Sequence, residues 1–135
     1  MAEFTSNVYI SIDWRQLETF KGIDLNDSFI LDWSHESDRL SFELEVSIWP
    51  ESAYYVEPKP DEYTCYRQAN LWFENVKAVS GLKAKDAVIT STDAGGSVDY
   101  GSIDSLVVLN DGFALEGDVG CIKIFGGELR FEICT

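Results

Sequence analysis

Cysteine and histidine are scarce in this 135-residue chain, which limits the metal and redox chemistry that it can carry. Its three cysteines, Cys65, Cys121 and Cys134, are widely separated, and His35 is its only histidine. An odd number of separated thiols does not make a disulfide framework, and one histidine without a Cys-x-x-Cys pair does not make a structural zinc site. We therefore expect reduced, partly buried thiols and no bound metal.

Long apolar runs and a basic leader are also missing. No apolar stretch approaches the roughly 20 residues that a membrane-spanning helix needs. The segment from Met1 to Asn7 contains Glu3 and no lysine or arginine, unlike the charged start of a secretory signal. The sequence therefore predicts a cytoplasmic protein without a membrane partner.

Basic residues are few, and the excess of acids is the strongest signal in the composition. Ten lysines and arginines stand against 24 aspartates and glutamates, which gives a formal net charge of −14. Every charged residue between Lys85 and Lys123 is an acid: Asp86, Asp93, Asp99, Asp104, Asp111, Glu116 and Asp118. Such a surface repels nucleic acid and attracts cationic proteins, although solubility alone is an alternative reason for it.

Two-residue alternation of apolar and polar side chains is abundant. From Arg39 to Ile48 every even position is apolar and every odd one polar, which predicts a half-buried β-strand. The segment from Phe29 to Ser34 alternates in the same way apart from Ile30, and the polar residues 35–38 predict a hairpin loop between the two strands. A chain of this length with 45% hydrophobic residues predicts a single domain over residues 1–135.

The C-terminal third predicts an antiparallel meander, because short alternating or apolar runs are separated by turn signals. The turns are expected at Asn110-Asp111-Gly112, at Gly117-Asp118-Val119-Gly120 and, as a further hairpin, at Gly126-Gly127. In the middle of the chain, residues 63–67 and 69–76 predict one long strand or two short ones, and residues 87–90 predict another.

Helical signals are confined to the segment from Asp13 to Phe20, where Asp13 is a suitable N-cap and Gly22 a suitable stop. The predicted fold class is therefore all-β. We expect a mainly antiparallel β-sandwich or open barrel of roughly eight or nine strands, with a meander at the C-terminus and one short N-terminal helix.

No arrangement of residues typical of an active site is present. His35 lies in a predicted hairpin loop, where its neighbours in sequence point away from it and do not form a triad. Chance pairs among so many carboxylates carry no specificity for glycoside hydrolysis, and Gly95-Gly96 lacks the lysine and spacing of a phosphate-binding loop. Asp111 to Asp118 offers oxygen ligands near glycines but does not match a calcium loop. We expect a non-enzymatic protein without catalytic residues or a cofactor.

Aromatic residues gather in the segment from Trp49 to Phe73. Alternation puts Leu71 and Phe73 on one face of a strand and leaves Trp72 on the other, where a second sheet is one possible cover. Exposed tyrosine and tryptophan are typical of protein interfaces and of sugar-stacking platforms. The members of the group are Trp49, Tyr54, Tyr55, Tyr63, Tyr66, Trp72 and Phe73.

Two stretches resemble small all-β immunity-protein domains of bacterial polymorphic toxin systems. Leu25 to Trp33 is similar to the family's leucine–polar–aspartate–small opening before a hydrophobic strand, with Asn26 where the family normally has histidine. Leu71 to Val79 is similar to the family's strand with leucine, an aromatic residue and a following valine. The resemblance implies a cytoplasmic protein that neutralises a cognate toxin by covering its active site, and it implies no catalytic residue.

Acidity, surplus aromatics and the missing catalytic set together favour a binding protein with a basic protein partner, such as a toxin. A carbohydrate-binding β-sandwich that stacks sugars on aromatic side chains is an alternative, and so is a structural domain that associates with itself through a strand edge. The oligomeric state stays open. The candidate partner-binding residues are Glu43, Glu45, Trp49, Tyr54, Tyr55, Trp72, Asp93, Asp99 and Asp104.

Overall fold

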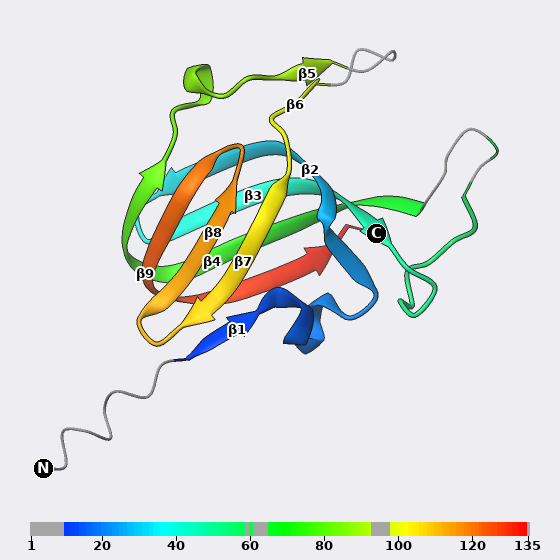
Figure 1. The fold of residues 1–135 in the computed structure, drawn as a ribbon, viewed down its shortest axis with the longest axis horizontal. Helices are drawn as coiled ribbons and strands as arrows, with labels where there is room; N and C mark the ends of the chain where they lie inside the picture. Colours follow the sequence, from blue (N-terminus) through cyan, green and yellow to red (C-terminus); the bar gives the residue numbers. More distant parts are fainter. Residues whose placement is uncertain (1–9, 59, 61–64, 93–97, 135) are drawn as a thin grey trace, which may run out of the picture.

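The computed structural model describes residues 10–58, 60, 65–92 and 98–134, and this part of the chain is mostly β-structure (Figure 1). The all-β prediction is confirmed. The strands are β1 (Ser11–Asp13), β2 (Ile23–Glu36), β3 (Arg39–Ile48), β4 (Cys65–Leu82), β5 (Ser91–Thr92), β6 (Val98–Asp99), β7 (Ile103–Leu109), β8 (Gly112–Gly117) and β9 (Gly120–Ile133).

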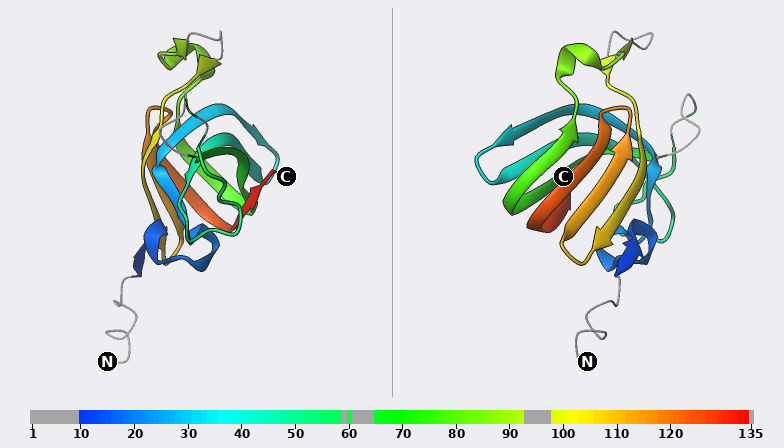
Figure 2. Two further views of the ribbon diagram at one scale, coloured as in Figure 1. Left: turned by 90° about the vertical axis from the view of Figure 1, so that its right-hand side faces the viewer. Right: turned by 60° about the vertical axis from the view of Figure 1, so that its left-hand side comes forward.

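Seven strands form one antiparallel sheet in the order β1-β7-β8-β9-β4-β3-β2, and β5 pairs with β6 in a separate small sheet. Figure 2 shows the large sheet strongly curved. The curvature brings β2 to the start of β7, where the Ile30 amide donates to the Gly101 carbonyl and the Tyr100 amide donates to the Ile30 carbonyl, both at 2.8 Å. The Asn26 side chain adds hydrogen bonds to the carbonyls of Ile103 and Asp104. The finer choice between a sandwich and an open barrel stays a prediction.

The alternation of β3 builds the core as the sequence predicts. Its even residues, from Leu40 to Ile48, are all buried at 1% exposure or less, and they point to the same side as Leu71 and Phe73 of β4. Direct cross-strand pairs such as Phe42 with Leu71 bury large apolar surfaces against each other, which is the main source of stability in a sheet of this kind.

Two long strands, β4 and β9, pair along most of their length and join the two halves of the sheet. The two segments predicted at 63–67 and 69–76 belong to one strand, although residues 63 and 64 lie outside the described part. The hairpin predicted at Gly126-Gly127 is wrong, because β9 continues through both glycines without reversing. They adopt φ values of 69° and 89°, and this conformation, which glycine adopts without strain, bends the strand instead of reversing it.

Two other local predictions are wrong. Asp13 to Phe20 does not form an α-helix but two single 3-10 turns, Trp14–Gln16 and Glu18–Phe20, although Asp13 does cap the first of them. Residues 87–90 do not form a strand. Ala87 is the last residue of a 3-10 turn, Lys85–Ala87, and after it Val88 is buried while Ile89 is 89% exposed.

The predicted turns at the other strand ends are confirmed. Ser37 and Asp38 connect β2 to β3, so the loop expected at 35–38 is shorter than predicted because the strands extend into it. Asn110 and Asp111 connect β7 to β8, and Asp118 and Val119 connect β8 to β9. Within the described ranges, no helix has the length and apolar character needed to cross a membrane.

Candidate functional site

The outward side of four neighbouring strands, β2, β3, β4 and β9, is rich in carboxylates. These positions alternate with the core residues, so their side chains leave the sheet on the side opposite the core. We call this surface the acidic face. Its acids include Asp24, Asp32, Glu36, Glu43, Glu45, Glu74, Glu128 and Glu132, and its bases include Arg39 and Arg130.

The strand register places several of these side chains in one row across the sheet. Asp32 lies opposite Glu43, Glu43 opposite Asn70, and Asn70 opposite Glu132. Strands in a sheet are about 4.8 Å apart, so the row presents oxygen-bearing side chains at regular short intervals. Glu43 is exposed, and Glu45, two residues further along β3 on the same face, is half-buried.

Cations hold parts of the acidic face together. The Arg130 guanidinium lies 2.9 Å from a Glu74 oxygen and 3.5 Å from a Glu128 oxygen. Lys85, which follows β4, forms an ion pair with Asp32. This hydrogen bond lowers the pKa of Asp32 below its ordinary value, although desolvation of the carboxyl acts in the opposite direction. The same bond raises the pKa of Lys85 above its ordinary value.

Trp72 lies on the acidic face, between Ser41 of β3 and Arg130 of β9. Its side chain is half-buried, and the Arg39 guanidinium lies 5.1 Å from the centre of its ring, which is a cation–π distance. The indole Nε1 is buried and has no hydrogen-bond partner among the described residues. An aromatic ring among charged side chains is typical of the centre of a protein interface.

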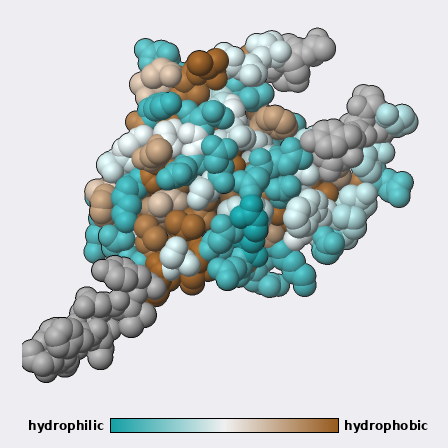
Figure 3. All heavy atoms as spheres, viewed as in Figure 1, coloured by the Kyte–Doolittle hydropathy of each residue, from teal (hydrophilic) through white to brown (hydrophobic). Residues whose placement is uncertain are grey.

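The outward side of β7, β8 and the first half of β9 differs from the acidic face. We call it the meander face, and its cross-strand rows are Ser105–Glu116–Cys121, Val107–Ala114–Lys123 and Leu109–Gly112–Phe125. Figure 3 shows hydrophobic residues gathered over the lower left of the molecule, where Figure 1 places β1 and the ends of β7 and β8. The rows of the meander face thus hold one carboxylate, Glu116, and one ammonium, Lys123.

The acids between Asp86 and Asp118 lie on different elements of the fold. Asp93 lies outside the described residues. Asp99 accepts a hydrogen bond from the Gly101 amide at 2.9 Å, and Asp118 accepts one from the Ser102 amide at 2.9 Å, so both carboxylates hold the turn that precedes β7. Asp104 is exposed on β7.

The calcium ligands considered in the sequence are likewise apart. Asp111 lies 3.0 Å from the Lys123 ammonium, and hydrogen bonding to that lysine lowers the pKa of the carboxyl. Asp118 is bound to the Ser102 amide at the other end of β8. Among the described residues, no group of three or more potential ligands is placed to hold a metal ion.

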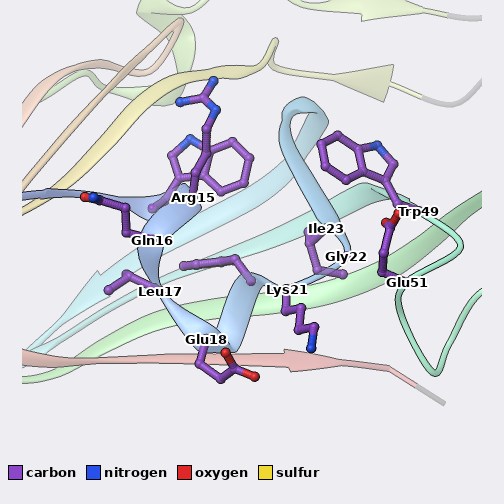
Figure 4. Close-up of a pocket in the computed structure, with 11 residues that line it drawn as sticks. Arg15, Gln16, Leu17, Glu18, Lys21, Gly22, Ile23, Trp49 and Glu51 are labelled. Atoms are coloured by element: carbon purple, nitrogen blue, oxygen red, sulfur yellow. The ribbon is translucent and has the colours of Figure 1, made fainter.

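The predicted aromatic platform is divided between two regions. Trp72 pairs with Ser41, whereas Trp49 follows the other end of β3, about 25 Å along the strand at 3.3 Å per residue. Trp49 and Tyr54 are 45% and 42% exposed, and Tyr55 packs partly against the core. Trp49 lines a pocket of about 360 Å³ together with the two N-terminal 3-10 turns (Figure 4).

The outward position of Glu43, Glu45 and Trp72 follows from the sequence, but the acids of β2 and β9 that lie beside them were not among the predicted residues. Glu128, Arg130 and Glu132 alternate with apolar residues, so their outward direction was visible in the sequence. Their position next to β4 depends on strand order, and the false hairpin at Gly126-Gly127 separated them from the rest of β9.

Comparison of the chain with models of protein families, with curated proteins and with solved structures gave no match.

Proposed function

We propose that this protein binds a cationic protein through the acidic face and has no enzymatic activity of its own. The proposal includes the immunity-type role that the sequence resemblance implies, in which the partner is a toxin whose basic active-site surface is covered. The observation that carries it is the cross-strand row from Asp32 through Glu43 to Glu132, with Trp72 in the next row.

The arrangement of the acids favours a binding role, because it costs stability. Like charges that face each other on neighbouring strands are destabilising, and both Asp32 with Glu43 and Glu74 with Glu128 are such pairs. Lys85 and Arg130 relieve part of this repulsion. Lysines and arginines of a partner would relieve more of it, so association with a cationic surface is favourable.

The chemistry of the face also fits a fast and specific association. Clustered negative potential steers a cationic partner during diffusion, and the resulting encounter rate falls as salt is added. Trp72 and its neighbour Arg39 provide a half-buried aromatic contact within the charged area, which supports affinity once the partner has docked.

The test is affinity capture from a lysate of the source organism on the immobilised protein at low salt, followed by a salt gradient. We expect one basic protein to be retained and released as salt rises. The double variant Glu43→Gln/Glu45→Gln should weaken retention about tenfold or more, because it removes two central charges while keeping side-chain size.

The matched control is Asp104→Asn/Glu116→Gln, which removes the same charge from β7 and β8 and should retain the partner as the unmodified protein does. Equal losses for both double variants would reduce the effect to net charge and contradict a specific acidic face. A partner whose retention does not weaken as the salt concentration rises would contradict the electrostatic mechanism.

A further inference from the structure

A groove lies at the end of the molecule that the N-terminal 3-10 turns cover, away from Trp72. It consists of the 360 Å³ pocket beside Trp49 and a second pocket of about 170 Å³ beside Tyr54 and Phe131. Lys21 and Ile23 line both pockets, so the two are adjacent. Figure 4 shows Arg15, Leu17 and Glu18 on one side of the larger pocket and Trp49 and Glu51 on the other.

The segment that carries Trp49 and Tyr54 is fixed by backbone hydrogen bonds. The Trp49 amide donates to the Gly22 carbonyl at 2.8 Å, and the Ser52 amide donates to the Trp49 carbonyl at 3.0 Å. The Ser52 hydroxyl accepts from the Tyr54 amide at 3.1 Å. Gly22 has φ 75°, and a Cβ at this position would lie 2.6 Å from the Ser52 nitrogen, so glycine permits the close approach.

The groove therefore presents two exposed aromatic rings on an ordered backbone. Trp49 and Tyr54 each belong to one of the two pockets, and both are more than 40% exposed, at 45% and 42%. Trp14 and Phe20, each 2% exposed, form an apolar floor with their rings 6.0 Å apart. The buried Trp14 Nε1 has no hydrogen-bond partner within the described part of the chain.

The two pockets of the groove each have equal numbers of acidic and basic side chains. The described lining of the larger pocket contains Arg15 and Lys21 against Glu18 and Glu51, and the smaller pocket has Lys21 against Glu132. Each pocket is thus balanced in a chain whose net charge is −14. A balanced site with both donors and acceptors does not select a strongly ionic ligand.

Neutral ligands that combine hydroxyl groups with flat apolar patches fit these features. Sugar rings stack their apolar face on tryptophan and tyrosine, and their hydroxyls both donate and accept hydrogen bonds with charged side chains. The pocket volume lies at the lower end of the range for small-molecule sites, about 300 to 1,000 Å³.

We propose that this groove binds a short neutral oligosaccharide, with Trp49 and Tyr54 as the stacking platforms. Of the acidic face as defined above, only Glu132 also lines the groove, at the smaller pocket, and sugar binding does not depend on the protein-binding role proposed above. Lys21, which lines both pockets, hydrogen-bonds the sugar hydroxyls between the two platforms.

The experiment is an NMR titration of the full chain with cellotetraose, maltotetraose, mannotetraose and chitotetraose, following the indole N–H signals of the tryptophans. At least one sugar should shift the Trp49 signal saturably with a dissociation constant of about 1 mM or lower. Trp49→Ala and Tyr54→Ala should each weaken binding about tenfold, since each removes one platform.

Both residues are exposed, so both variants should stay folded. Phe125→Ala, which removes an aromatic side chain of the meander face that is 37% exposed, should leave sugar binding unchanged. The proposal is overturned if none of the four sugars shifts the Trp49 signal at about 10 mM, or if binding survives in both platform variants.

Discussion

The acidic face and the meander face are the outward sides of one continuous sheet, and they differ in almost every outward side chain. Facing inward, both halves are alike: Leu44 of β3 and Leu115 of β8 are each fully buried. Facing outward, the first carries many carboxylates beside Arg39 and Arg130, whereas the rows of the second carry Glu116, Lys123 and apolar or small residues, with Asp104 exposed next to them.

The comparison separates what folding requires from what it leaves open. Folding requires an apolar inward side, and both halves supply one by the same alternation. The outward sides have no such requirement, and opposed carboxylates such as Glu74 and Glu128 repel each other unless a cation, here Arg130, lies between them. Folding therefore does not explain the concentration of acids in one half, which is the reason for the binding role proposed above.

The largest expected effects come from the inward sides and test whether both halves share one core. Leu44→Ala and Leu115→Ala should each lower the free energy of unfolding by about 2 to 5 kcal/mol, because each leaves a cavity at a position with 0% exposure. Urea denaturation followed by tryptophan fluorescence and by circular dichroism measures both variants.

The two probes should report one coincident transition in each variant, as expected for a single cooperative domain. Separate transitions in Leu115→Ala would show that the meander unfolds independently of β2, β3 and β4. The acidic face and the meander face would then belong to two separate folding units.

The smallest expected effect is the stability lost when one exposed ion pair is broken, and each half of the sheet offers one such pair. In the folded chain, hydrogen bonding to Lys85 lowers the pKa of Asp32, so this pair stabilises the fold above the ordinary aspartate pKa of about 3.9, and the stabilisation is lost as pH falls further. Lys85→Gln should cost at most about 1 kcal/mol near neutral pH, because both side chains are 47% exposed and solvent screens them.

The cost of Lys85→Gln should vanish below the folded pKa of Asp32, where the carboxyl is protonated with or without the lysine. Lys123→Gln, which breaks the pair with Asp111, should have a smaller effect at low salt, because Lys85 also experiences the charge of Glu43. Thermal denaturation across pH 2 to 8 measures both. A larger loss of stability for Lys123→Gln than for Lys85→Gln would contradict a more negative potential at the acidic face.

Much of the fold could be predicted from local patterns. The bounds of β3 follow from strict alternation, and the turn after Leu109 follows from the Asn-Asp-Gly signal. The predictions failed where a local signal has two structural outcomes. A Gly-Gly pair permits both a reversal and a bend, and at Gly126-Gly127 pairing with β4 decides for the bend.

The helical prediction failed for a similar reason. Asp13 and Gln16 form a capping box, which begins a 3-10 turn as well as an α-helix. Leu17 then leaves the helical region with ψ 129°, and the second turn brings Phe20 to 4.8 Å from the ring of Phe131. Trp14 and Phe20 are thus buried at the end of the sheet by two separate 3-10 turns and not by one α-helix.

The candidate sites could be predicted less well than the fold, because they depend on which distant segments of the chain become neighbours. Glu43, Glu45 and Trp72 face outward by alternation alone. The neighbours that turn them into a surface, Asp32 and Glu132, come from strands whose order the sequence does not show. The groove required the contact of Gly22 with Ser52, which no periodic pattern indicates.

The most direct test of the acidic face as a binding surface is an NMR titration of the full chain with an octa-arginine peptide at low salt. The backbone amide shifts should concentrate on Glu43, Asn70, Trp72 and their neighbours on β2 and β9, should spare Trp49 and the meander face, and should disappear at high salt. Shifts spread evenly over all exposed acids, including Asp104 and Glu116, would show that the acidity serves net charge alone and would contradict this account.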